Sequence, residues 1–206
     1  MFGLNTSLSI EDVGGCADFR ALSSIAGIGI DLRYAGPDNF VGRDLYSPYD
    51  CAWLHVDAAA ALEKSVAWLA VARPGWSVLI LDALRPQRVQ QELWDALAGT
   101  PLQMYLAEPS RGSIHSFGMA IDITLLDANG REIDMGSGFD EMSERSHPAL
   151  EPLLLASGEI TPGQVANRQL LRDAMAHGGF HGINSEWWHY DFGDRDRVRH
   201  SYRRVL

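Results

Sequence analysis

Apolar and polar positions alternate differently in successive parts of the chain. Residues 1–50 hold only short apolar runs between Gly, Asp, Asn and Pro, which favours loops and short strands. Val56 to Ala72 lacks Gly and Pro and is rich in Ala, Leu and Trp. Asp57 near its start suits the positive end of a helix dipole, and Pro74-Gly75 stops the pattern. This segment is therefore predicted to be a helix from Val56 to Ala72.

Four further segments have the character of strands. The short apolar run from Trp76 to Leu81 predicts a buried strand. Met119 to Leu126 alternates imperfectly and predicts another. Asn129-Gly130 is a hairpin signal, with Arg131 to Met135 as the predicted return strand. The aromatic-rich segment from Trp187 to Phe192 is the predicted last strand.

Proline and glycine frame two more helices. Gln87 to Leu97 follows Pro86, which is placed at the first helical position, and precedes Gly99. Thr161 to Ala176 begins at a residue that can cap it and ends before Gly178-Gly179. Helices around an antiparallel sheet that contains a hairpin indicate an α+β fold.

Length and composition restrict the class of protein. The chain has 206 residues, so residues 1–206 are expected to form a single domain, a central antiparallel sheet flanked by helices. Its 46% hydrophobic and 21% charged residues are ordinary for a globular protein. The net charge of −10 argues against a nucleic-acid partner and against docking on an anionic membrane. The tail from Asp194 to Arg204 alternates Asp and Arg, which predicts a solvated terminus that neutralises its own charge.

Cysteine usage and the N-terminus indicate the compartment. Cys16 and Cys51 are the only cysteines and form no C-x-x-C motif, so two ordinary thiols are expected, although one bridge is possible. No apolar stretch approaches the ~18 residues of a transmembrane helix. The first 15 residues carry Glu11 and Asp12 and no positive charge, unlike a secretory signal. Either the protein stays in the cytoplasm or a signal was removed before residue 1. Met1 favours the first, so a cytoplasmic protein without a membrane partner is predicted.

Two polar clusters contain the candidate chemistry. One is SIHSFGMAID, from Ser113 to Asp122, and the other is EWWH, from Glu186 to His189. A catalytic zinc takes three protein ligands and keeps one position for water. Together, His115, Asp122 and His189 supply three ligands. Glu186 is then left beside the metal, where a metallohydrolase needs its general base.

The spacing inside each cluster sets a structural requirement. A turn at Gly118 places His115 before it and Asp122 in the strand after it. Burying that carboxylate without a partner costs several kcal/mol, so a cation partner is expected. Glu186 and His189 are three residues apart, which puts them on one face of a helix but on opposite faces of a flat strand. A bend is therefore required between them.

Each residue also has an ordinary reading. Histidines are more often structural than ligating, and this applies to five of them: His55, His147, His177, His181 and His200. Arg85, in the segment Asp82 to Pro86, lies at the end of a predicted strand, where its planar fork of donors can face an oxyanion. Alternatively it is a surface arginine that pairs with Asp82. The chain has no H-E-x-x-H, G-x-S-x-G or phosphate-loop motif.

The clusters also occur in the order and spacing of a known family. The matching segments are DLRYAGPDNFVG (Asp31 to Gly42), DALRP (Asp82 to Pro86), SIHSFGMAID (Ser113 to Asp122), MGSGFDEMSERSHP (Met135 to Pro148) and EWWHY (Glu186 to Tyr190). The chain resembles the zinc D-Ala-D-Ala peptidases, the superfamily of D,D-carboxypeptidases and the hedgehog signalling domain. Within it, the chain is similar to the D-alanyl-D-alanine dipeptidases, the branch known from vancomycin resistance.

The resemblance implies one zinc per chain, a small dipeptide substrate and a role for each matching residue. His115, Asp122 and His189 are implied as zinc ligands. Glu186 is implied as the base that later passes its proton to the leaving amine, and Arg85 as the group that stabilises the tetrahedral intermediate. The implied substrate-binding residues are Ser113 and Asp140, which hold the two ends of the dipeptide, and Tyr34, which lines the pocket.

Two alternatives to a D-Ala-D-Ala dipeptidase remain at this point. A peptidoglycan D,D- or L,D-carboxypeptidase needs an open cleft and export. A non-catalytic zinc module of the hedgehog type need not keep both Glu186 and Arg85, and this chain has both. The segment from Gly99 to Ser113 departs from the pattern of the branch, so the mouth of the pocket is where specificity can differ. The sequence pattern carries no information on oligomeric state. Antibiotic resistance, cell-wall recycling and D-alanine nutrition are equally compatible with the activity.

Overall fold

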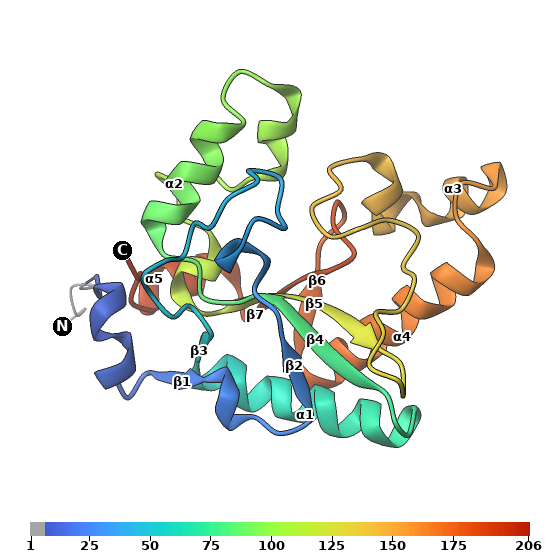
Figure 1. Ribbon diagram of the computed structural model, residues 1–206, viewed down its shortest axis with the longest axis horizontal. Helices are drawn as coiled ribbons and strands as arrows, with labels where there is room; N and C mark the ends of the chain where they lie inside the picture. Colours follow the sequence, from blue (N-terminus) through green and yellow to red (C-terminus); the bar gives the residue numbers. More distant parts are fainter. Residues whose placement is uncertain (1–6) are drawn as a thin grey trace.

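A five-stranded mixed sheet forms the centre of the computed structural model, which describes residues 7–206 (Figure 1). In spatial order its strands are β2 (Ile28–Ile30), β4 (Ser77–Asp82), β5 (Ala120–Leu126), β7 (His189–Phe192) and β6 (Phe180–Gly182). The pairs β4–β5, β5–β7 and β6–β7 are antiparallel, whereas β2 and β4 run parallel. The α+β class is therefore confirmed, with one parallel pair where a wholly antiparallel sheet was expected.

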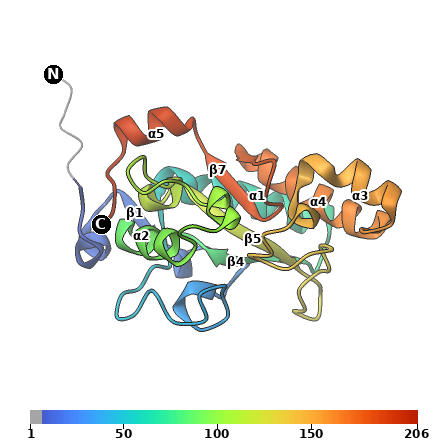
Figure 2. The same cartoon turned by 90° about the horizontal axis from the view of Figure 1, so that it is seen from above.

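Two long helices cover one face of this sheet. Helix α1 (Val56–Ala72) has the predicted bounds, and α4 (Pro162–Gly178) extends two residues beyond its prediction. They lie side by side under the sheet in both views (Figures 1 and 2). Gly178 allows this close approach, because a Cβ there would lie 2.5 Å from the carbonyl oxygen of Ala61 on α1. The Thr161 capping box begins α4 as the sequence indicates.

Shorter elements cover the opposite face and the ends of the sheet. These are β1 (Phe19–Ala21), β3 (Trp53–His55), α2 (Gln87–Ala96), α3 (Glu151–Ser157) and α5 (Arg195–Ser201), with short 3₁₀ helices at Ile10–Gly15, Leu22–Ser24, Arg33–Ala35, Pro101–Tyr105 (η4), Ile114–Phe117 (η5), Glu144–Ser146 and Pro148–Leu150. The predicted helix after Pro86 ends one residue early, and Pro86 is its N-cap rather than its first residue. Strand β4 lies one residue later than predicted.

The predicted return strand from Arg131 to Met135 is wrong. The turn at Asn129-Gly130 forms, but only Glu132 makes a β-bridge, to Leu126. The reason is that this edge of β5 is shared. Strand β7 occupies the edge beside residues 120–122, so the returning chain pairs only with the last residues of β5.

The predicted last strand begins later than expected but ends at Phe192 as predicted. Trp187 and Trp188 form a bend, so β7 begins only at His189.

The tail from Asp194 to Arg204 is not simply solvated, since it contains α5, and Val198 is buried. Apolar contact outweighs the local charge pattern there because the tail folds back over η5.

The structure also bears on the predictions about cysteines and membrane spans. Cys16 and Cys51 are both free thiols, as the sequence favours. Between residues 7 and 206, no helix combines the length and apolar character that crossing a bilayer requires. The segment read as lacking a secretory signal lies in part outside the described residues, because the description begins at residue 7.

Candidate active site

The central strands bring the two predicted clusters together. Asp122 on β5 is directly opposite His189 on β7. Strand alternation turns Asp122 away from its isoleucine neighbours, which pack toward the helices, and toward the other face of the sheet. His115 reaches the same point from η5, which ends at Gly118 with φ +64°. A Cβ at Gly118 would lie 2.7 Å from the backbone nitrogen of His55, so only glycine allows this turn.

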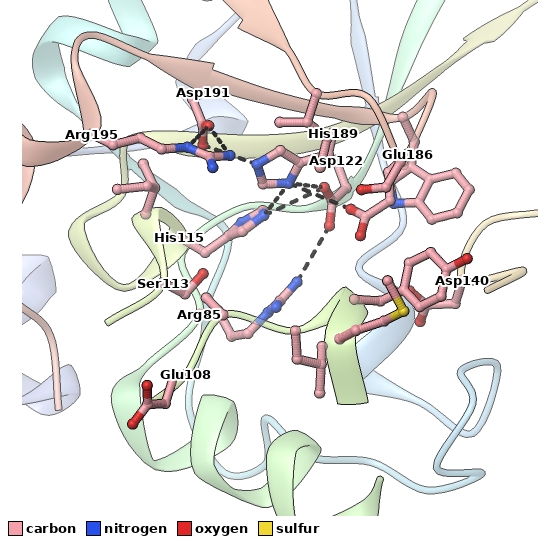
Figure 3. A pocket seen from close by; sticks show the side chains of 18 of the residues that line it. Arg85, Glu108, Ser113, His115, Asp122, Asp140, Glu186, His189, Asp191 and Arg195 are labelled. Carbon is pink, nitrogen blue, oxygen red and sulfur yellow. Dashed lines mark hydrogen bonds and ion pairs between the residues drawn. The ribbon is translucent and has the colours of Figure 1, made fainter. Parts of the chain in front are cut away.

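The three predicted ligand atoms form a small triangle (Figure 3). His115 Nε2 lies 3.2 Å from His189 Nδ1 and 3.4 Å from Asp122 Oδ1, and the third edge, from His189 Nδ1 to Asp122 Oδ1, is 3.0 Å. Zinc–ligand distances of about 2.0–2.1 Å in a tetrahedral site place two ligand atoms about 3.3–3.4 Å apart. The side chains therefore already have nearly the spacing that one zinc ion requires.

The partners behind each imidazole determine which nitrogen is available to a metal. His115 Nδ1 donates to the carbonyl oxygen of Ala83 at 2.8 Å. His189 Nε2 donates to Asp191 Oδ1 at 2.9 Å. Because neither a carbonyl nor a carboxylate can donate, each neutral ring carries its proton on that outer nitrogen. The inner nitrogens then present lone pairs to each other and to the carboxylate of Asp122.

Three acceptors that face one another inside the protein need a positive charge between them. His115, Asp122 and His189 are all buried, so water does not compensate the acceptors. Neighbouring negative charges also act on His189. Burial lowers the pKa of this histidine, but the charges of Asp191 and Asp122 outweigh burial and raise it. The donor set of two imidazoles and one carboxylate is one that zinc accepts. These residues fit a zinc ion. Asp122 also has a cation partner within the protein, since its Oδ2 accepts from Arg85 Nη2 at 3.3 Å.

Glu186 lies at the edge of this triangle. The bend at the two tryptophans turns it toward the same side as His189, and its Oε2 lies 4.0 Å from His189 Nδ1. The bend that the sequence required is therefore present. Burial raises the pKa of Glu186 to about 7, and His189 opposes this only partly. A carboxyl group whose pKa is near neutrality can both accept and release a proton.

Arg85 pairs with Asp82, as one of the two alternatives expected, but it is buried and not a surface residue. Its Nε donates to Asp82 Oδ2 at 2.9 Å, and its Nη2 donates to Asp122 Oδ2 at 3.3 Å. A third hydrogen bond, from Nη1 to Gln90 Oε1, holds the buried fork in place. A further contact of 2.6 Å joins Nη2 to Asp82 Oδ2, so four of the five N–H groups of the guanidinium are engaged and one on Nη1 remains for a ligand. Arg85 thus lines the pocket while it pairs with Asp82.

The substrate-binding residues expected from the resemblance line the same cavity of about 400 Å³. Asp140 lies across the pocket from the triangle (Figure 3), and its Oδ2 accepts from the Tyr34 hydroxyl at 2.9 Å. Burial raises the pKa of Asp140 well above its usual range, although the hydrogen bond from Tyr34 opposes this. No helix begins at Asp140, which excludes a capping role. Its φ of +57° is a strained conformation for a non-glycine residue. Ser113 lies next to η5 and is also buried.

Comparison with known proteins agrees with this geometry. The family model of peptidase M15, described as D-ala-D-ala dipeptidase, matches residues 17–205. The chain belongs to this family.

Relatives in the M15 dipeptidase family align over most of their length. The D-alanyl-D-alanine dipeptidase of Escherichia coli K12 is 44% identical over 162 residues, covering 79% of this chain and 77% of the relative. The D-alanyl-D-alanine dipeptidase of Enterococcus faecium is 35% identical, with 82% and 88% covered. That of Synechocystis is 33% identical, with 92% and 86% covered.

Other residues of this M15 site were not singled out from the sequence. Asp191 lies two residues after a predicted ligand, where strand alternation could have indicated it. Arg195 belongs to the tail that was read as solvated, and no local signal placed it in the pocket. At the mouth of the pocket, the Tyr105 hydroxyl lies 2.8 Å from His147 Nε2. This contact joins the segment from Gly99 to Ser113 to the loop that contains Asp140. Tyr105 and Asp140, one from each of these segments, line the cavity.

Proposed function

We propose that the chain is a zinc-dependent dipeptidase that hydrolyses D-Ala-D-Ala to two molecules of D-alanine. The observation that carries the proposal is the triangle of His115, Asp122 and His189 with Glu186 beside it. The D-alanyl-D-alanine dipeptidases among its relatives supply the substrate class. A zinc ion held by these three residues supplies Lewis-acid chemistry, which polarises a peptide carbonyl and makes water more acidic.

The side chains around the triangle have separate tasks in this proposal. Glu186 takes a proton from the attacking water and returns it to the leaving amine, a transfer that its raised pKa favours. Arg85 directs its remaining Nη1–H at the oxygen of the scissile carbonyl as negative charge develops. The fixed hydrogen bonds to Asp82 and Gln90 avoid reorganisation of the guanidinium at that moment.

The ends of the dipeptide have partners at the two ends of the cavity. Asp140 pairs with the free ammonium group, which supplies the positive charge that this buried carboxyl lacks. Tyr34 orients Asp140 through its hydroxyl. Ser113 offers its hydroxyl to the carboxylate of the second residue. A pocket that recognises a free ammonium excludes peptides that are extended at that end.

A comparison of D-Ala-D-Ala with its N-acetyl form tests this function. Purified protein should release D-alanine from D-Ala-D-Ala, lose the activity with a chelator, and recover it with zinc. The N-acetyl substrate should be cut with a kcat/KM about 10²–10⁴-fold lower, because acylation removes the charge and leaves Asp140 unpaired. Similar kcat/KM values for both substrates would contradict the proposal and favour a carboxypeptidase. Zinc binding without hydrolysis would indicate a non-catalytic module.

The variant Asp140→Asn isolates the charge at this position. Asparagine tolerates the positive φ, so it keeps the backbone while it removes the carboxylate. Turnover of D-Ala-D-Ala should fall and discrimination against the N-acetyl form should shrink, measured as the ratio of the two kcat/KM values. Glu141→Gln is the matched control, because the neighbouring Glu141 bonds to Gly138 and Ser143 and does not line this cavity. Unchanged discrimination in Asp140→Asn would exclude Asp140 from this role.

Arg85→Ala should lower kcat by about 10²–10³-fold and change KM little, as expected for an interaction made in the transition state. Steady-state kinetics of zinc-loaded protein measures the split. Arg88→Ala is the control, since Arg88 bonds to the carbonyl oxygens of Leu45 and Tyr46 outside the cavity. A change confined to KM would assign Arg85 to substrate binding instead.

A further inference from the structure

Asp191 lies directly behind one of the proposed zinc ligands. It follows His189 by two residues on β7, so both side chains point to the pocket face of the sheet. Its Oδ1 accepts from His189 Nε2 at 2.9 Å, on the side of the ring away from Asp122 (Figure 3). The residue opposite Asp191 on β5 is Ala120, whose small side chain leaves room for a further group.

The further group beside Asp191 is the side chain of Arg195. It is the first residue of α5, and its Nε and Nη2 lie 2.6 Å and 2.5 Å from Asp191 Oδ2. The two oxygens of Asp191 are thus divided between one histidine and one arginine. Asp191 is only 4% exposed. Its carboxylate cannot rotate without losing an ion pair or the hydrogen bond to His189.

His189 needs such a partner more than His115 does. His115 Nδ1 donates to a backbone carbonyl at 2.8 Å, and the carboxylate on that side of its ring, Asp82 Oδ2, is farther away at 3.6 Å. His189 lies between two carboxylates, with Asp122 Oδ1 3.0 Å from Nδ1. A single ring proton on Nδ1 would satisfy Asp122 but close that nitrogen to a metal. A proton on Nε2 satisfies Asp191 and leaves Nδ1 available.

We propose that Asp191, anchored by Arg195, is a positioning residue that keeps the proton of His189 on Nε2 and turns Nδ1 toward the metal. This inference rests on the proposed zinc site. It assigns a task to Arg195, a residue of the C-terminal tail that follows His189 by six positions. A hydrogen-bonded carboxylate also makes the imidazole a stronger donor to the metal.

Zinc affinity of three variants tests the inference, measured by competition with a chromophoric chelator. Asp191→Ala should bind Zn²⁺ about 10–100-fold more weakly. Asp191→Asn should weaken Zn²⁺ binding less, because its amide oxygen still accepts from Nε2. Arg195→Gln should also weaken Zn²⁺ binding. Asp127→Asn is the matched control: Asp127 pairs with Arg131 at the same spacing and 2.9 Å, but in an exposed turn. It should bind Zn²⁺ as the unmodified protein does.

The visible spectrum of the Co²⁺-substituted protein separates positioning from general stability. The d–d absorption bands report the ligand geometry, so they should change in the Asp191 variants and stay unchanged in Asp127→Asn. If Asp191→Ala fails to fold, Asp191→Asn and Arg195→Gln supply the same comparison. Unchanged Zn²⁺ affinity and Co²⁺ bands in the folded variants would overturn the inference. If His189→Ala also bound Zn²⁺ with full affinity, the proposed zinc site itself would be refuted.

Discussion

Replacing Glu186 by glutamine should leave zinc bound and lower the turnover of D-Ala-D-Ala by about 10²–10⁴-fold, the usual contribution of general acid–base catalysis. Glutamine keeps the size of the side chain and its place beside His189, but it cannot accept a proton from water. Glu186 lies 4.0 Å from the ligand nitrogen of His189 and outside the triangle of ligand atoms. Removing its charge should therefore affect the chemistry and leave the metal in place.

Metal analysis and D-alanine release, measured on the same preparation, check this expectation. Glu108→Gln is the control, because Glu108 lines the same cavity but lies at its other end, away from Glu186 (Figure 3). It should retain most of the activity. Loss of zinc from Glu186→Gln would make the glutamate a ligand and invalidate the assignment of roles. Full activity of Glu186→Gln would exclude it as the base.

Replacing His115 by alanine should abolish stoichiometric zinc binding and, with it, the peptidase activity. The triangle then loses one of its three ligands. The loss of zinc affinity should exceed the factor of about 10–100 that is typical when only a partner behind a ligand is removed. A metal that binds only the native state stabilises it by RT ln(1 + [Zn²⁺]/Kd), which increases with the free zinc concentration. Added zinc should therefore raise the midpoint of thermal unfolding of the unmodified protein and leave that of His115→Ala unchanged.

Elemental analysis of the purified protein, together with thermal unfolding with and without zinc, measures both effects. His177→Ala is the matched control, since His177 lies on the exposed side of α4 against Trp68. It should bind one zinc per chain. Because the histidines must lose their protons to bind, affinity should weaken in acid. Equal zinc in His115→Ala and the unmodified protein would remove His115 from the site.

Local sequence signals were sufficient for the regular elements. The bounds of α1 follow from a segment without Gly or Pro that ends before Pro74-Gly75. The start of α4 follows from the Thr161 capping box, whose two hydrogen bonds lie within four residues. Signals of this kind depend on neighbours in the chain, so no knowledge of the tertiary structure is needed to read them.

Pairing in the sheet was less predictable because it depends on distant segments. The parallel pair β2–β4 and the short return after Asn129-Gly130 both depend on which strands occupy each edge. The helix at Arg195–Ser201 has a charged sequence typical of a solvated tail, yet Val198 is buried. Tertiary contact overrides local preference in these places.

The site shows the same division. The sequence alone indicated His115, Asp122, His189 and Glu186 as candidates, because an acid in an apolar strand and a carboxylate beside two histidines suit a metal and a base, and the family resemblance implied their roles. It could not indicate that Asp191 and Arg195 stand behind His189, or that Tyr105 meets His147 across the pocket mouth. Residue chemistry is a property of the chain. The distances that suit one carboxylate to hold a metal, another to accept a proton and a third to support His189 arise only when β5, β7 and η5 converge.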